Sequence, residues 1–385
     1  MAVATVEKLL HEAAQGRRLT ADEAVRLHRE AELLDLGQAA RAARFRHVPE
    51  RRVTYLVDRN INYTNVCITD CHFCAFYRHS ETHPEAYTLS RAAIAAKMEE
   101  LLDAGGTRVL MQGGHNPRLP LAWYEELLRW MRAEYPEIEL NCFSPSEIDH
   151  IAQIEGCTMT EVLRRLQAAG LDGLPGGGAE MLDDEVRGRV SPKKQSAAGW
   201  LEAMRIAQSL GLVTTATMVI GFGETAEQRV GHLLKLRTLQ DESLRRHGAG
   251  FAAFIAWTLQ IENTSLGASK ERGLFGASAH EYLRLVALAR LFLDNFDHVQ
   301  ASWPTQGTKL AQVALEFGCD DFGSTMMEEN VVSAAGTSLC SVAEIALQRG
   351  IQEAGYVPAQ RDSRYRILRR IDKVPDPAAP RRVRA

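Results

Sequence analysis

The sequence predicts an α/β protein whose main unit is a (βα)8 barrel of parallel strands, with a helical extension at its N-terminus and a further extension at its C-terminus. Two observations predict this fold class. From residue 53 onward, short apolar or β-branched runs alternate with stretches of helical periodicity, as in repeated βα units around a parallel sheet. These runs number eight, the number of strands in such a barrel. An open, doubly wound sheet has the same alternation and stays an alternative, because periodicity does not show whether a sheet closes.

The N-terminal helical extension is expected over residues 1–46. Ala, Glu, Leu and Arg recur there at helical spacing. Thr20 suits the N-cap of one helix, because the acids Asp22 and Glu23 fall in the turn that follows it. We therefore expect two or three helices before the barrel.

The barrel itself is expected over residues 47–335. Its strands are expected at residues 53–60, 108–112, 138–143, 170–174, 213–220, 251–257, 299–303 and 319–323. Helices are expected between them at residues 91–104, 121–133, 159–169, 197–210, 225–240 and 279–293. Residues 336–385 are expected to form a C-terminal helical extension that ends in a mobile tail, because residues 375–385 combine three prolines with exposed charge.

The composition favours a small-molecule partner. A formal net charge of -4 and a sequence pI near 6.3 provide no broad basic surface for nucleic acid or anionic lipid. The N-terminal stretch lacks the apolar region of a signal peptide, and no run approaches the roughly 18 apolar residues of a membrane span. We therefore expect a cytoplasmic protein with no nucleic-acid or membrane partner.

The cysteine usage indicates metal binding rather than disulfides. Seven cysteines are few for 385 residues, and three of them fall within eight positions, so a secreted disulfide framework is not expected. The other four are scattered and are expected to be small, buried hydrophobic residues. They are Cys142, Cys157, Cys319 and Cys340.

The clustered cysteines, Cys67, Cys71 and Cys74, follow the first predicted strand with CxxxCxxC spacing. Soft thiolates at this spacing favour an iron–sulfur or zinc site. Three thiolates hold three corners of a 4Fe-4S cluster and leave the fourth iron open to the amino and carboxylate groups of S-adenosylmethionine. The alternative is structural zinc, which normally takes four ligands and would recruit His72 or His79. The place after a strand favours the cluster, because barrel enzymes keep their chemistry at the carboxyl ends of strands.

Two glycine-rich turns after later strands are expected to contact the cofactor or the substrate. Gly113 and Gly114 lack side chains, so their backbone can approach the methionine amino group; an ordinary tight turn is the alternative. Glu180 follows the PGGG turn at 175–178. It is expected to accept hydrogen bonds from ribose hydroxyls or from the substrate, with a solvated loop glutamate as the alternative.

Two other strand ends supply further candidates. Ile220 and Gly221 end the fifth strand with apolar atoms and bare backbone, which suit an adenine face. Glu224 follows them and is expected to cap the next helix rather than to catalyse. Ser144 closes the third strand and offers a polar group to the mouth of the barrel.

Six segments together resemble the family of cyclic dehypoxanthine futalosine synthases, radical S-adenosylmethionine enzymes of menaquinone biosynthesis. They are NYTNVCITDCHFCAFYR, QGGHNP, GLPGGGAE, FGETAEQR, QASWPTQG and DDFGSTMMEENVV, and the likeness extends from about residue 45 to residue 370. The cysteine loop alone is typical of the whole superfamily, and the combination of motifs narrows it to this family. The resemblance implies a TIM-type barrel, a 4Fe-4S cluster on Cys67, Cys71 and Cys74, S-adenosylmethionine on the open iron, and a position beside adenine for Phe73.

The resemblance also implies a reaction. The substrate would be dehypoxanthine futalosine, whose ribose carries a 3-carboxyphenyl ketone. A 5′-deoxyadenosyl radical would take hydrogen from the ribose C4′, and the carbon radical would add to the aromatic ring. Glu180, His115 and Asp321 are candidates for the base that accepts the final proton, and a flavodoxin- or ferredoxin-type reductase is the expected electron donor. Aminofutalosine synthase or a deazaflavin synthase subunit is the alternative within this class, and a metal-binding scaffold without turnover is the alternative from another class.

Overall fold

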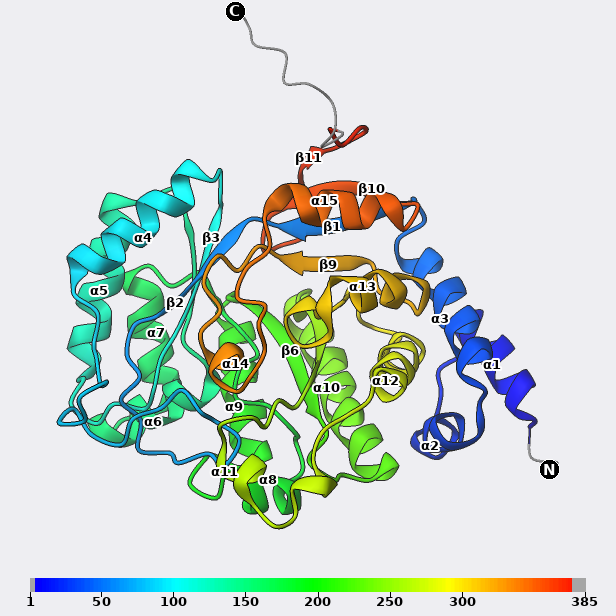
Figure 1. Ribbon diagram of the computed structural model, residues 1–385, viewed down its shortest axis with the longest axis horizontal. Helices are drawn as coiled ribbons and strands as arrows, with labels where there is room; N and C mark the ends of the chain where they lie inside the picture. Colours follow the sequence, from blue (N-terminus) through cyan, green and yellow to red (C-terminus); the bar gives the residue numbers. More distant parts are fainter. Residues whose placement is uncertain (1–3, 376–385) are drawn as a thin grey trace, which may run out of the picture.

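The computed structural model describes residues 4–375 of the chain. In these residues the strands form one sheet of eleven, in the order β11-β10-β1-β9-β8-β7-β6-β5-β4-β3-β2, with helices around it (Figure 1). Neighbouring strands run parallel except for β10 and β11. The strands are β1 (Arg52–Leu56), β2 (Asp58–Asn62), β3 (Arg108–Gln112), β4 (Glu139–Cys142), β5 (Gly173–Leu174), β6 (Val213–Ile220), β7 (Phe251–Thr258), β8 (Val299–Gln300), β9 (Asp321–Ser324), β10 (Val357–Arg361) and β11 (Ile367–Arg370).

The helices of the described part are mostly the crossovers between these strands. None of them is long and apolar enough to cross a membrane. They are α1 (Val6–Ala14), α2 (Ala21–Glu30), α3 (Leu33–His47), α4 (Arg91–Asp103), α5 (Leu121–Glu134), α6 (Pro145–Glu155), α7 (Met159–Ala169), α8 (Asp184–Val190), α9 (Ala197–Ser209), α10 (Ala226–His247), α11 (Ser265–Ala268), the 3-10 helix η1 (Arg272–Leu274), α12 (Ala279–Phe292), α13 (Trp303–Glu316), α14 (Val331–Ala334) and α15 (Glu344–Glu353).

One stretch of chain joins the two sides of this sheet, so that the sheet curls into a barrel. β1 and β2 are consecutive and are separated only by Val57. β1 pairs in parallel with β9, while β2 pairs in parallel with β3. The Asn60 amide, within β2, also donates to the Met326 carbonyl just after β9 at 2.8 Å. The predicted barrel is therefore confirmed, and the first predicted strand, 53–60, is the stretch at which its two sides meet.

Most predicted barrel elements are present, with changes at their ends. β3 and β6 coincide with the runs predicted at 108–112 and 213–220. The run predicted at 299–303 ends earlier, because Trp303 already begins α13 and Pro304, with its fixed φ, suits the first turn of a helix. The short helices α6 and α8 were not predicted, and neither was α13.

The N-terminal extension consists of three helices, as expected. Thr20 caps α2 and exchanges hydrogen bonds with Glu23 in a capping box. α3 packs against α12, and α1 packs against α3, so the extension covers one side of the barrel (blue in Figure 1). Leu36 and Ala40 of α3 are fully buried by this packing.

The C-terminal extension differs from the prediction, which was helical. After α15 the chain forms β10 and β11, an antiparallel pair joined by a tight turn. β10 lies parallel beside β1, where Val357 pairs with Arg52. These partners are far apart in the sequence, so no local periodicity indicates their pairing. From residue 376 on, the tail predicted to be mobile lies outside the described residues.

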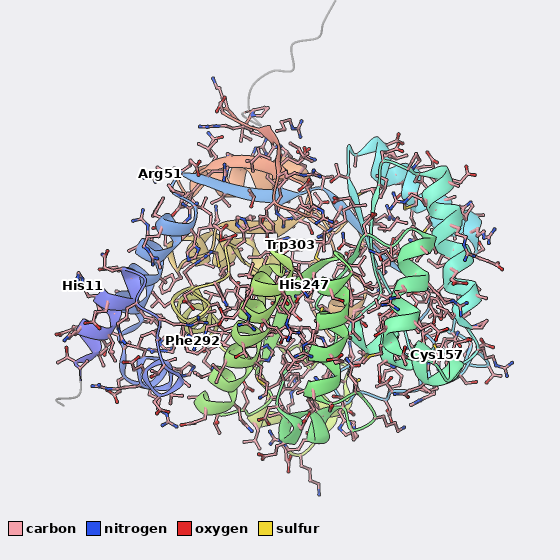
Figure 2. All side chains as sticks on the ribbon, turned by 180° about the vertical axis from the view of Figure 1, so that it is seen from behind. His11, Arg51, Cys157, His247, Phe292 and Trp303 are labelled. Carbon is pink, nitrogen blue, oxygen red and sulfur yellow. The ribbon has the colours of Figure 1, made fainter. Side chains whose placement is uncertain are left out.

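The four isolated cysteines match the expected burial only in part. Cys142 and Cys319 are fully buried in the core. Cys157 is half-buried and lies on the side of the molecule opposite the N-terminal helices, as Figure 2 shows. Cys340 is exposed, so the prediction of a buried side chain was wrong for this residue.

Candidate active site

The three clustered cysteines lie on the loop that leaves β2, at the carboxyl edge of the parallel strands. Cys71 is buried, and Cys67 and Cys74 are half-buried. Within the loop, the Cys67 amide donates to the Arg78 carbonyl at 2.9 Å, and the Cys74 amide donates to the Cys71 carbonyl at 3.1 Å. The loop therefore presents its three thiols at the edge of the sheet where barrel enzymes bind their ligands.

Asn65 holds the two ends of this loop together, a role that was not predicted. Its side chain accepts from the Tyr87 amide at 2.8 Å and donates to the Glu85 carbonyl at 2.9 Å. Its own carbonyl accepts from the Arg78 amide at 2.7 Å. A side-chain amide that both donates and accepts can replace backbone pairing across a loop. The only signal in the sequence was its place in the NYTN segment before the first cysteine.

Burial disfavours ionisation of two of the three thiols, Cys71 and Cys74. In residues 4–375, no group of three or more His, Cys, Asp or Glu side chains is arranged to hold a metal ion. Burial raises the pKa of Cys71 to about 12 and also raises the pKa of Cys74. Buried thiols ionise when a metal binds, because the cation stabilises the thiolate. Three thiols on one loop therefore fit a centre that takes three ligands from the protein.

Both histidines of the loop have a neighbour other than the thiols. His72 Nδ1 lies 3.0 Å from the Arg189 carbonyl oxygen. His79 is exposed and its Nε2 lies 3.8 Å from a carboxylate oxygen of Asp70. Because structural zinc normally takes four protein ligands, these positions disfavour the zinc alternative.

The interior of the barrel holds a cavity of about 320 Å³ that begins beside the cysteine loop. Phe73 and Cys74 line it there. Alternate residues of β6, including Thr215, Thr217 and Val219, line its wall, because successive side chains of a strand point to opposite faces. A cavity of this size, lined by both apolar and polar side chains, is typical of a small-molecule site.

Glu180 lines the cavity and is held by two cations. Its carboxylate lies 2.8 Å from Lys194 Nζ and 3.8 Å from the Arg187 guanidinium. Its Oε2 is buried and has no hydrogen-bond partner among the described residues. Burial lowers the pKa of Lys194, but the Glu180 carboxylate and the Cys71 side chain together outweigh this effect and the net shift is upward. A ligand-facing carboxylate fits this geometry, whereas a solvated loop glutamate does not, since only 11% of the Glu180 side chain is exposed.

Gly113 and Gly114 pack closely against the protein itself, and their contact with the methionine amino group stays a prediction. A Cβ at Gly113 would lie 2.5 Å from the Tyr63 ring. A Cβ at Gly114 would lie 2.2 Å from the Val66 carbonyl oxygen and 2.8 Å from the Cys67 Cβ. Neither glycine lines the cavity. The two glycines therefore allow their turn to lie directly against the cysteine loop.

Glu147 joins this turn to the barrel, and it was missed as a functional candidate. Its carboxylate accepts from the Gly113 amide at 3.0 Å, from the Tyr63 hydroxyl at 2.8 Å and from the Ser144 hydroxyl at 2.7 Å. Burial raises the pKa of Glu147 to about 7. Ser144 also caps α6 and does not line the cavity, so it supports the turn through Glu147. The S-x-x-E spacing of Ser144 and Glu147, a helix-start pattern, was the available signal.

At the end of β6, the residues on either side of the predicted pair Ile220 and Gly221 line the cavity, and the pair itself does not. Ile220 is fully buried and Gly221 is not among the lining residues, whereas Val219 and Phe222 line the cavity. The Glu224 carboxylate accepts from the Gly221 amide at 3.1 Å and from the Phe222 amide at 2.7 Å. Glu224 is thus occupied with holding this turn, and the expectation that it caps the next helix was wrong, because Thr225 caps α10.

Two of the three predicted proton acceptors lie away from the cavity wall. His115 stacks on His150 with 4.9 Å between ring centroids, and its Nδ1 lies 2.7 Å from the Thr69 hydroxyl. Burial lowers the pKa of His115. Asp321 is fully buried and pairs with Arg361 at the amino-terminal end of the barrel. Of the three candidates, only Glu180 lines the cavity.

Comparisons with known proteins agree with this geometry. The Radical SAM superfamily profile matches residues 61–236, and the profile of the CofH/MqnC C-terminal region matches residues 248–374. A cyclic dehypoxanthine futalosine synthase from Halalkalibacterium halodurans is 44% identical, over 95% of this chain and 95% of its own length. A 5-amino-6-(D-ribitylamino)uracil--L-tyrosine 4-hydroxyphenyl transferase from Archaeoglobus fulgidus is 39% identical, over 82% of this chain and 89% of its own length. The crystal structure of methylornithine synthase has a TM-score of 0.70 at 20% identity, covers 91% of this chain and 97% of its own, and shows the same fold.

Proposed function

We infer the function of this chain from the family to which it belongs, the radical S-adenosylmethionine enzymes that include the cyclic dehypoxanthine futalosine synthases. The chain oxidatively cyclises dehypoxanthine futalosine to cyclic dehypoxanthine futalosine in the futalosine pathway of menaquinone biosynthesis. The observation that carries this conclusion is 44% identity to such a synthase across 95% of both chains. The resemblance drawn from the sequence motifs is thereby confirmed.

The cofactors assigned to the site are one 4Fe-4S cluster and S-adenosylmethionine. Cys67, Cys71 and Cys74 would hold the cluster, and S-adenosylmethionine would bind beside them. The support is local: the loop offers three thiols, and its two histidines are engaged elsewhere or exposed. When bound and reduced by one electron, these cofactors supply a 5′-deoxyadenosyl radical, which removes the C4′ hydrogen of the substrate.

The residues around the cavity bind and orient the reactants. Phe73 and Phe222 contact each other with 5.5 Å between ring centroids and provide an apolar surface for adenine beside the cysteine loop. Glu180 accepts hydrogen bonds from ribose hydroxyls through Oε2, which has no partner among the described residues. Lys194 fixes the direction of the Glu180 carboxylate. The buried walls keep water from the reactive carbon.

The remaining chemistry takes place on the substrate. The carbon radical at C4′ adds to the aromatic ring and forms the new carbon–carbon bond. Loss of one electron and one proton restores the aromatic ring, so the product is lighter than the substrate by one molecule of hydrogen. The electron passes to a one-electron carrier of the flavodoxin or ferredoxin class. Glu180 is the candidate for the proton, because it is the predicted acceptor that lines the cavity.

The partners proposed are therefore the small-molecule substrate and a reductase or flavodoxin- or ferredoxin-type electron donor, which would supply the electron that starts the reaction. Reduced thiols and a low-potential donor suit the cytoplasm, where disulfides are rare. No nucleic-acid or membrane partner enters the proposal.

An anaerobic assay with substrate deuterated at C4′ tests the proposal. The reconstituted enzyme with S-adenosylmethionine and reductant should move deuterium into 5′-deoxyadenosine and release the cyclised product, both measured by mass spectrometry. Consumption of the substrate without deuterium transfer would contradict C4′ abstraction. If the enzyme ignores this substrate and joins S-adenosylmethionine to an enolpyruvyl benzoate, the activity is that of an aminofutalosine synthase. If no substrate releases 5′-deoxyadenosine, the chain is a metal-binding scaffold.

A further inference from the structure

The turn between β10 and β11, residues 362–366, closes the amino-terminal end of the barrel. Tyr365 of this turn and Arg361 just before it line the cavity. Arg108, the first residue of β3, lines the same end. We call Arg108, Arg361 and Tyr365 the cavity floor. It lies at the opposite end of the strands from the cysteine loop.

Tyr365 is held in an unusual conformation. Its φ is 61°, in the left-handed region that bulky residues rarely adopt. Its ring stacks on the His298 imidazole with 3.7 Å between centroids, and the Arg361 guanidinium lies 3.9 Å from the ring centroid. Its hydroxyl is buried and has no hydrogen-bond partner among the described residues. An unpartnered buried hydroxyl on a strained residue is unfavourable by itself and is typical of a site that awaits a ligand.

Both arginines of the floor are held from behind by buried carboxylates. Arg361 pairs with Asp321, and Arg108 pairs with Asp58. Neither of these acids lines the cavity. The ion pairs fix the direction of the guanidinium groups and balance their charge, and each guanidinium has five N–H donors, of which its acid uses only some. Donors therefore remain for a ligand.

The acids that line the cavity lie toward its other end. Glu180 follows β5 and Glu329 follows β9, at the carboxyl edge of the sheet where the cysteine loop also lies. The floor presents hydrogen-bond donors, whereas the upper end presents the unpartnered Oε2 of Glu180, because the Glu329 carboxylate already accepts from the Val331, Val332 and Ser333 amides. A ligand with a carboxylate at one end and hydroxyls at the other is therefore matched in one orientation only.

We propose that the cavity floor binds the carboxylate of the substrate's 3-carboxyphenyl group and thereby directs the ribose toward the cysteine loop. The proposal rests on the proposed function, which supplies an aryl carboxylate at one end of the substrate and a ribose at the other. Arg361 and Arg108 donate N–H groups to the carboxylate, and Tyr365 donates its free hydroxyl. The ribose hydroxyls then meet Glu180, and C4′ faces the end where the radical forms.

The variant Tyr365→Phe tests this site, because it removes the hydroxyl and keeps the stacked ring. Substrate affinity is measured by titration of the enzyme that carries its cluster and S-adenosylmethionine, without reductant, so that no turnover occurs. The comparison ligand is the analogue with an unsubstituted phenyl ring. We expect Tyr365→Phe to weaken binding of the carboxylate substrate roughly tenfold and to leave the phenyl analogue unchanged. Arg361→Lys, which keeps a charge opposite Asp321 but loses the forked donor, should show the same selective loss.

Tyr356→Phe is the matched control, because its hydroxyl contacts Glu316 outside the cavity at 2.8 Å. It should leave both affinities unchanged. Equal weakening of the substrate and the phenyl analogue in Tyr365→Phe would overturn the proposal, since the hydroxyl would then be structural. The proposal would also be overturned if Tyr365→Phe weakened binding of the substrate but not of analogues that lack a ribose hydroxyl. The ribose, rather than the carboxylate, would then bind at the floor. Selective carboxylate binding without any cyclised product would instead leave the carboxylate site standing and refute the proposed function.

Discussion

Replacing Gly114 by alanine tests whether the glycine turn positions the cysteine loop. The new Cβ would lie 2.2 Å from the Val66 carbonyl oxygen, where an ordinary contact is about 3.4 Å, so the loop must move by about 1.2 Å. The oxygen belongs to the backbone and cannot rotate away. Overpacking of this kind typically costs about 1–3 kcal/mol. For a chain of this size, such a loss lowers the unfolding temperature by about 1–4 °C.

The displacement falls directly on the residue before Cys67, so we expect the cluster content to decrease before the affinity for S-adenosylmethionine does. Iron and sulfide counting after anaerobic reconstitution measures the first quantity, and titration of the remaining loaded enzyme measures the second.

The matched control is Gly231→Ala within α10. A Cβ at Gly231 meets nothing within 4 Å, so alanine should stabilise the helix by about 0.5–1 kcal/mol and leave the cluster intact. If Gly114→Ala binds a full cluster and unfolds at the wild-type temperature, the packing argument is wrong.

Three further predictions concern other parts of the site. Alanine at Cys67, Cys71 or Cys74 should abolish cluster binding and turnover with the fold retained, whereas Cys340→Ala, at an exposed cysteine outside the loop, should change neither iron content nor activity. Glu180→Gln removes the charge paired with Lys194 and should lower kcat/KM at least roughly tenfold in steady-state assays; wild-type kinetics would remove Glu180 from the site. Because burial raises the pKa of Glu147 from 4.5 to about 7, the folded protein keeps a proton that the unfolded chain releases, and stability falls as pH rises through this interval. Glu147→Gln should remove that part of the slope in urea unfolding at about pH 5 and pH 8, and an unchanged slope would contradict the role of this carboxyl.

Features that depend on neighbouring residues were predictable from the sequence. The capping box of Thr20 and Glu23 forms within one turn of helix, and β3 and β6 follow runs whose apolar side chains alternate over a few residues. The cysteine loop belongs to the same class, because its three thiols lie within eight positions of one another. Their spacing already indicated a centre with three protein ligands.

Other parts of the site are formed by residues that are distant in the sequence. Glu147 reaches the Gly113 amide across 34 positions, so no local pattern showed that this carboxylate holds the glycine turn. His115 follows a strand as Glu180 does, whereas Asp321 begins one, and both face other side chains because their directions depend on what packs around them. No local pattern records that difference.

The chain's periodicity and cysteine spacing thus specified a barrel and the edge of it that carries the chemistry, because both arise from contacts a few residues apart. Only the tertiary structure decided how the sheet curls into a barrel through the pairing of β1 with β9. It also decided that Tyr365, near the C-terminus, lines the floor of the cavity. These contacts join segments hundreds of residues apart. Their free energy comes from burying whole surfaces together, which no single stretch of sequence encodes.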